Sequence, residues 1–107
     1  MNKTDKYLFD IQHAISLIEN FTKDTSTFAD YEKDFKTQSA VERQLAIIGE
    51  AIGKLKKESK VFEIENAKQI VDLSNRLIHS YDNIDNAIVW TIIKRHLPEL
   101  KHEVENI

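Results

Sequence analysis

The chain has 107 residues, of which 41% are hydrophobic and 31% are charged, a balance typical of one globular domain and not of a disordered chain. It contains no cysteine, which excludes disulfides and thiolate metal sites and fits a reducing cytoplasm. The formal net charge of −3 argues against a general electrostatic grip on nucleic acid, so any RNA would have to bind at a local patch.

Long helices are expected in the first half, because the whole chain has only two glycines and one proline. We predict a helix over 5–22, a loop over 23–27, a short helix over 28–35 capped by Thr27, and a long helix that starts after Thr37 as N-cap and ends near Glu58. The N-terminal segment is amphipathic and no stretch reaches the ~20 apolar residues of a membrane span, so we expect neither a signal peptide nor a membrane helix. Residues spaced by three and four form the apolar stripes of the two long helices: Leu8, Ile11, Ile15, Ile18 and Phe21, then Val41, Leu45, Ile48, Ile52 and Leu55.

Two more helices are expected in the second half, after a polar break at Ser59 and Lys60. The first should span 65–81 and end in a turn at 82–83. The second should begin at Asp85 as N-cap, and Pro98 should kink it between 94 and 98, because proline removes a backbone donor and clashes with the preceding turn. The apolar residues assigned to the core are Ile70, Leu73, Leu77 and Ile78, then Ile88, Val89, Ile92, Ile93, Leu97, Leu100 and Val104. Residues 1–107 are therefore expected to form a single all-α domain, an up-and-down bundle of four main helices and one short helix.

Gly49 and Gly53 both fall inside the long central helix, where each costs up to about 1 kcal/mol relative to alanine. Because they are four residues apart, they should open one side of that helix to close approach by another helix. The approaching helix belongs either to the same chain or to a second copy.

The stretch 72–82 places several chemically active side chains on one helix. Residues three and four apart share a helix face, so Asp72, Asn75, Arg76 and His79 should form one polar strip, with Tyr81 at its end. One interpretation is a solvated face with an Asp72–Arg76 ion pair. The other is a functional site in which His79 moves protons near neutral pH and Arg76 binds phosphate in a forked geometry.

The remaining histidines, His13, His96 and His102, are isolated from one another. No pair has the i,i+4 spacing that helical metal sites use, so we expect no metal site and no cofactor.

Three blocks of the sequence resemble the HEPN superfamily, in its HepT-like toxin branch. Residues 74–81 resemble the family motif, which reads Arg, usually Asn, a short apolar run, His, one residue and Tyr. Residues 37–51, with their Ile-Gly-Glu-Ala run, resemble the most typical helix of the family. Residues 7–11 resemble its first helix, and 84–90 with 97–100 its last. The resemblance covers nearly the whole chain and implies a homodimer joined through the motif helices.

The resemblance also implies a function. Active family members are metal-independent endoribonucleases of the cytoplasm, so His79 is expected to act on the proton of the RNA 2′-hydroxyl or on the leaving group, with Asn75 and Arg76 in support. The branch pairs with a nucleotidyltransferase antitoxin, which would add AMP to Tyr81. The sequence departs from the motif at Ser74, where the family has arginine.

Three hypotheses follow from this departure. The first is a ribonuclease toxin under antitoxin control, favoured by Asn75, His79 and Tyr81. The second is a HEPN protein of weak or no nuclease activity that serves as a nucleotidyltransferase-binding helical module, favoured by Ser74. The third is a helical dimerisation domain without a site.

Overall fold

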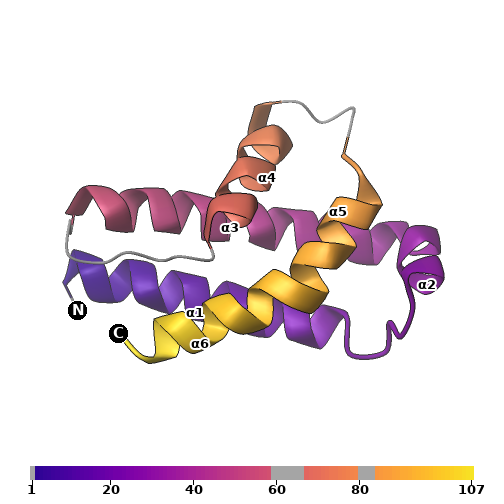
Figure 1. Cartoon of the computed structure of the whole chain (residues 1–107), viewed down its shortest axis with the longest axis horizontal. Helices are drawn as coiled ribbons and strands as arrows, with labels where there is room; N and C mark the ends of the chain where they lie inside the picture. Colours follow the sequence, from indigo (N-terminus) through magenta and orange to yellow (C-terminus); the bar gives the residue numbers. More distant parts are fainter. Residues whose placement is uncertain (1, 59–66, 80–83) are drawn as a thin grey trace.

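The computed structural model describes residues 2–58, 67–79 and 84–107, with the backbone alone at residue 79, and in these residues it is all-α (Figure 1). The helices are α1 (Lys3–Phe21), α2 (Phe28–Lys33), α3 (Phe35–Glu58), α4 (Lys68–His79), α5 (Asn86–Thr91) and α6 (Leu97–Glu105), with a π-helical segment at Ile92–His96 between the last two. None of the described helices is long and apolar enough to span a lipid bilayer. The predicted break at 59–60, the ends of the predicted helix 65–81 and the turn at 82–83 lie outside the described residues.

The helix starts follow from short polar side chains that cap free backbone N–H groups. Thr27 and Asp85 cap α2 and α5 as predicted, accepting hydrogen bonds from the backbone N–H groups of residues 30 and 87 at 3.1 and 2.8 Å. The prediction of Thr37 as the cap of α3 is wrong. The cap is Asp34, whose carboxylate accepts bonds from the Thr37 backbone N–H at 3.0 Å and from the Thr37 hydroxyl at 2.6 Å. The helix therefore begins at Phe35, directly after α2.

The core is organised by α1 and α3, which lie side by side and run in opposite directions (Figure 1). The ion pair between Lys3 and Glu58, with Nζ and Oε1 3.9 Å apart, joins the start of one to the end of the other. The predicted apolar stripe of α3 is completely buried. On α1 the middle of the stripe is buried, while its outer members Leu8 and Phe21 are only partly buried.

Helix α4 packs on α3 through a notch at Gly49. A Cβ atom added to Gly49 would overlap the Oγ and Cβ of Ser74, whose Cα would lie 3.8 Å away. The close approach predicted for Gly49 is therefore confirmed, and it occurs within one chain. Gly53 behaves differently, because no described atom lies within 4 Å of a Cβ added there. Figure 1 shows α4 rising steeply away from α3, and of the two glycines only Gly49 lies where α4 packs.

The last helix departs from α geometry just before its proline. The backbone N–H of Leu97 donates to the carbonyl of Ile92, five residues back, and Pro98 follows in the first turn of α6. Where the sequence predicts a kink between 94 and 98, the structure has a π segment, in which the chain stays helical around the missing proline donor. The core assignment of Ile88 is wrong, since its side chain is 40% exposed while the neighbouring Val89 is buried. Adjacent helix positions point about 100° apart, and here Val89 faces the core while Ile88 does not.

Candidate functional site

Helix α4 separates a polar face from a packed one. Asp72, Asn75 and Arg76 are exposed, whereas Leu73 and Leu77 are buried, which confirms the predicted division for these residues. Ile78, which is predicted to lie in the core, is only partly buried and lines a groove. No ion pair joins Asp72 to Arg76, although both side chains are exposed as the solvated-face interpretation requires. The helix ends at His79, and the side chain of this residue, like all of Tyr81, lies outside the described part of the chain.

Ser74 faces away from this polar strip and into the bundle. Its side chain is 2% exposed, and its hydroxyl donates to the carbonyl of Val71 at 2.9 Å. Because it rests in the Gly49 notch, position 74 is a helix-packing position in this chain. A long cationic side chain has no room there unless α3 and α4 move apart.

A groove of about 360 Å³ lies between α3 and α4. It is beside the end of α4, the motif helix, so called because it carries the family motif. Helix α4 crosses α3 so that its later part lies toward the earlier part of α3: Ser74 packs at Gly49, and Ile78 lines the groove with Arg43. The groove is therefore next to the turn of α4 that ends at His79. It is lined by Glu42, Arg43, Ala46, Glu50, Leu77 and Ile78.

This groove supplies polar groups that the sequence reasoning did not assign to the site. Arg43 is exposed on its wall and offers a cation on the side of α4 where Ser74 has none. Burial raises the pKa of the neighbouring Glu42 carboxyl above its usual value. The only signal in the sequence was that both residues belong to the 37–51 block, seven and six positions before Gly49.

A second groove, of about 330 Å³, lies on the other side of α4, against α5 and the π segment. Its lining includes Gln69 of α4, Ile88 of α5 and His96 of the π segment. His96 is isolated from the other histidines as predicted, but its buried Nδ1 has no hydrogen-bond partner among the described atoms. In the described parts of the chain, no three metal-ligating side chains gather.

Comparison with known proteins gives a consistent result. The profile of the ribonuclease HepT-like family matches residues 11–107. A probable ribonuclease HepT of Thermococcus cleftensis is 38% identical over 102 residues, which cover 94% of this chain and 92% of that protein. A putative RNase of Methanocaldococcus jannaschii is 35% identical over 108 residues, covering 98% of each chain. A putative RNase of Caldanaerobacter subterraneus is 35% identical over 82 residues, covering 76% of this chain and 73% of that protein. No solved structure gives a significant match.

These matches extend along almost the whole helical domain and include all of α3, α4 and the two grooves between which α4 lies. The all-α fold of the described residues, and a helix α4 with one exposed polar face and one buried apolar face, agree with these matches. The chain belongs to the HepT-like ribonuclease family of the HEPN superfamily.

Proposed function

We propose that this protein is a metal-independent endoribonuclease, the toxin of a toxin–antitoxin pair, and that a nucleotidyltransferase antitoxin controls it. The observation that carries the proposal is the arrangement of α4, which exposes Asn75 and Arg76 on one face and ends at His79. An imidazole that titrates near neutral pH suits transfer of the 2′-hydroxyl proton, and a guanidinium suits a phosphate that gains charge.

The cation on the α3 side of this site is assigned to Arg43. The family motif that residues 74–81 resemble begins with arginine, but here that position is filled by a buried serine. Arg43 stands on the groove that adjoins the end of α4. A guanidinium from α3 would then hold the phosphate on one side, while Arg76 approaches it from the exposed face of α4.

The working form is proposed to be a cytoplasmic homodimer joined through the motif helices. The exposed Ile88 and the groove between α4 and α5 support this, because they leave apolar surface beside the motif helix. Two α4 helices facing each other would enclose one RNA strand between two polar strips.

Control by the antitoxin is proposed to act at Tyr81, two residues beyond His79. An AMP group there would add a phosphate and a base at the end of α4 and exclude RNA by charge and volume. Tyr31 cannot be the acceptor in the folded protein, because its side chain is completely buried. Mass spectrometry after incubation with the proposed nucleotidyltransferase partner and ATP should locate the adduct on Tyr81. An adduct on Tyr7 alone would refute this assignment.

An alternative function is a binding module for the nucleotidyltransferase without nuclease activity. The buried Ser74 in the Gly49 notch favours it, because loss of one charge-stabilising donor costs roughly 10²–10³ in rate. In that case the polar face of α4 would contact the partner and not RNA.

Cleavage of a mixed RNA substrate in the presence of EDTA separates the two functions. We expect cleavage by the wild type, a loss of ~100-fold or more in His79→Ala, and unchanged cleavage in His102→Ala. His102 is exposed on α6 and serves as the matched control. Cleavage that persists in His79→Ala would remove that residue from the site. A folded wild type that cleaves no RNA but binds the nucleotidyltransferase would establish the module.

A further inference from the structure

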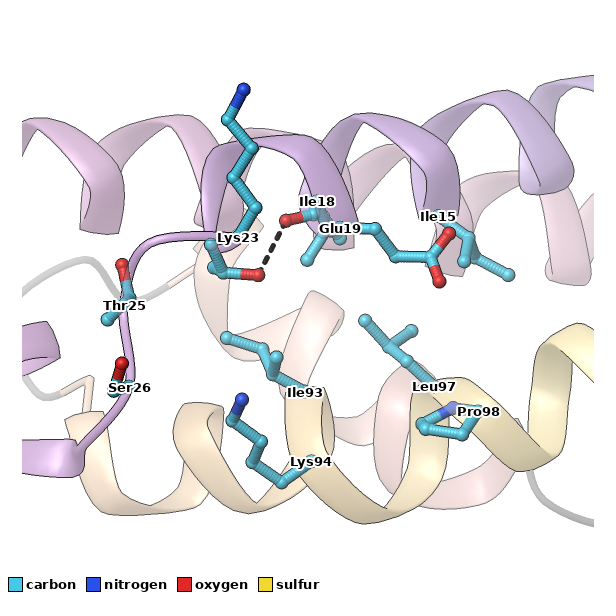
Figure 2. Close-up of a pocket in the computed structure, with 11 residues that line it drawn as sticks. Ile15, Ile18, Glu19, Lys23, Thr25, Ser26, Ile93, Lys94, Leu97 and Pro98 are labelled. Carbon is cyan, nitrogen blue, oxygen red and sulfur yellow. Dashed lines mark hydrogen bonds between the residues drawn. The ribbon is translucent and has the colours of Figure 1, made fainter.

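A cavity of about 460 Å³ lies away from the motif helix, between α1, the segment that follows it and the last helix (Figure 2). Its volume falls within the range of small-molecule sites, roughly 300–1,000 Å³. The residues that line it are Ile15, Ile18, Glu19, Thr22, Lys23, Thr25, Ser26, Ile93, Lys94, Leu97 and Pro98. None of them belongs to the motif or to the grooves beside α4.

One wall of the cavity is aliphatic and the opposite end is polar. The aliphatic side chains of Ile15, Ile18, Ile93 and Leu97 are each buried and form the wall. The polar end carries the hydroxyls of residues 22, 25 and 26, two of which belong to threonines that are only 8% exposed. The cavity therefore suits a ligand with an apolar body and one polar end.

The charge at the polar end is positive. Figure 2 shows the Lys94 side chain extending toward the segment that carries Thr25 and Ser26, whereas the Lys23 ammonium points away from the cavity. Glu19 is the one carboxylate among the lining residues, and the ammonium of Lys101 already pairs with it at 3.2 Å. The cation at Lys94 is thus not neutralised from within the cavity.

Two features of the fold distinguish this cation from an ordinary surface lysine. Lys94 belongs to the π segment. Such segments are rare in proteins overall, but those that occur are often found at functional sites. The Lys94 Nζ also lies 4.6 Å from the ring centroid of Trp90, a cation–π distance. An ammonium held over an aromatic ring loses less freedom when it binds an anion than a free surface lysine does.

We propose that this cavity binds a small molecule with an apolar body and a single carboxylate or phosphate group. Lys94 and the hydroxyls of Thr25 and Ser26 hold the anion, and the aliphatic wall covers the body. A second anionic group is disfavoured, because it would lie against Glu19. The site does not depend on RNA cleavage, so it stands or falls independently of the proposed nuclease.

Three probes of equal chain length test the site: octanoate, octyl phosphate and the neutral 1-octanol. Trp90 is the only tryptophan of the chain, so its fluorescence reports on the ammonium above its ring. Amide NMR shifts at 22–26 and 93–98 give an independent readout. We expect saturable binding of at least one anion with a Kd on the order of 1 mM, and at least about tenfold weaker binding of 1-octanol. The octanoate and octyl phosphate arms decide between carboxylate and phosphate.

Two variants complete the test. Lys94→Met keeps the apolar stem but removes the charge, and it should abolish the preference for the anion. Lys23→Met is the matched control and should bind like the wild type, since its ammonium points elsewhere. The proposal is overturned by shifts that do not saturate, by equal binding of 1-octanol and the anions, or by an unchanged anion preference in Lys94→Met. Both lysines are exposed, and circular dichroism confirms that each variant is folded.

Discussion

Replacement of glycine by alanine should have opposite effects on stability at the two glycines of α3, Gly49 and Gly53. Replacing glycine by alanine in a helix interior gains about 0.5–1 kcal/mol from propensity alone. At Gly53 nothing described in the chain opposes that gain, because no atom lies within 4 Å of the added Cβ. Gly53→Ala should therefore raise the free energy of unfolding by about 0.5–1 kcal/mol.

At Gly49 the same methyl group would overlap Ser74. The overlap includes the Ser74 Cβ, so rotation of the hydroxyl cannot relieve it and α4 must shift. Overpacking of this kind typically costs about 1–3 kcal/mol, against which the propensity gain is roughly 1 kcal/mol. Because the overlap reaches the Ser74 Cβ, the cost should lie at the upper end of that range, so Gly49→Ala should lose about 1–2 kcal/mol, a difference of about 1.5–3 kcal/mol between the two variants.

Urea unfolding followed by circular dichroism measures both variants, and thermal melts should show a separation of about 4–8 °C per kcal/mol in a domain of this size. The double variant Gly49→Ala/Ser74→Gly moves the notch to the other helix. It should be more stable than the sum of the single effects predicts. A Gly49→Ala protein as stable as the wild type would refute the packing of α4 on α3. Destabilisation by Gly53→Ala would instead show that another surface, such as a second copy, uses that position.

Four further predictions follow from the described contacts. Ser74→Arg should lower the free energy of unfolding by at least about 2 kcal/mol in urea melts, because a buried notch cannot hold a cation; an equally stable variant would show that position 74 is accessible. Arg43→Ala should slow RNA cleavage by about 10–100-fold at unchanged stability, whereas the exposed Lys36→Ala on the same helix should have no effect on the measured rate. Hydrogen bonds at the start of α3 lower the pKa of Asp34, so its stabilising effect is present above about pH 4 and is lost as the pH falls through the folded-state pKa. Asp34→Ala should accordingly melt at a lower temperature at pH 7 and lose less on acidification than the wild type. Burial raises the pKa of Glu42, so its ionised form opposes folding, and Glu42→Gln should become more stabilising as the pH rises above about 4.3 in a series of melts.

The apolar stripes were predictable because helix periodicity alone selects them. On α3 the five residues spaced by three and four are all completely buried. The pair Ile88 and Val89 shows where periodicity fails, since both are apolar and adjacent, and only tertiary contacts decide which one faces the core. The same limit applies to Asp34 and Thr37, which are both good cap residues and lie three apart. The structure selects Asp34 because its carboxylate reaches two donors of Thr37 at once.

The polar strip of α4 could also be predicted, because its residues are close in the sequence. The groove beside it could not, since Arg43 and Ile78 are far apart in the chain and meet only through the crossing of α3 and α4. The importance of Ser74 was visible from the motif, but its burial depends on a glycine 25 positions earlier. Pairwise spacing within one helix carries no information on that contact.

The antiparallel pair of α1 and α3 has a consequence for how the protein is made. Both helices are encoded before residue 59, and the capped α2 that joins them needs only local hydrogen bonds. Once this half of the chain has left the ribosome, the apolar stripes of α1 and α3 are both available to pack against each other. The early hairpin can then close before the motif helix emerges, since domains begin to fold from the N-terminus during synthesis. Helix α4 would dock onto a surface that is already built, and α5 and α6 would complete the core after it.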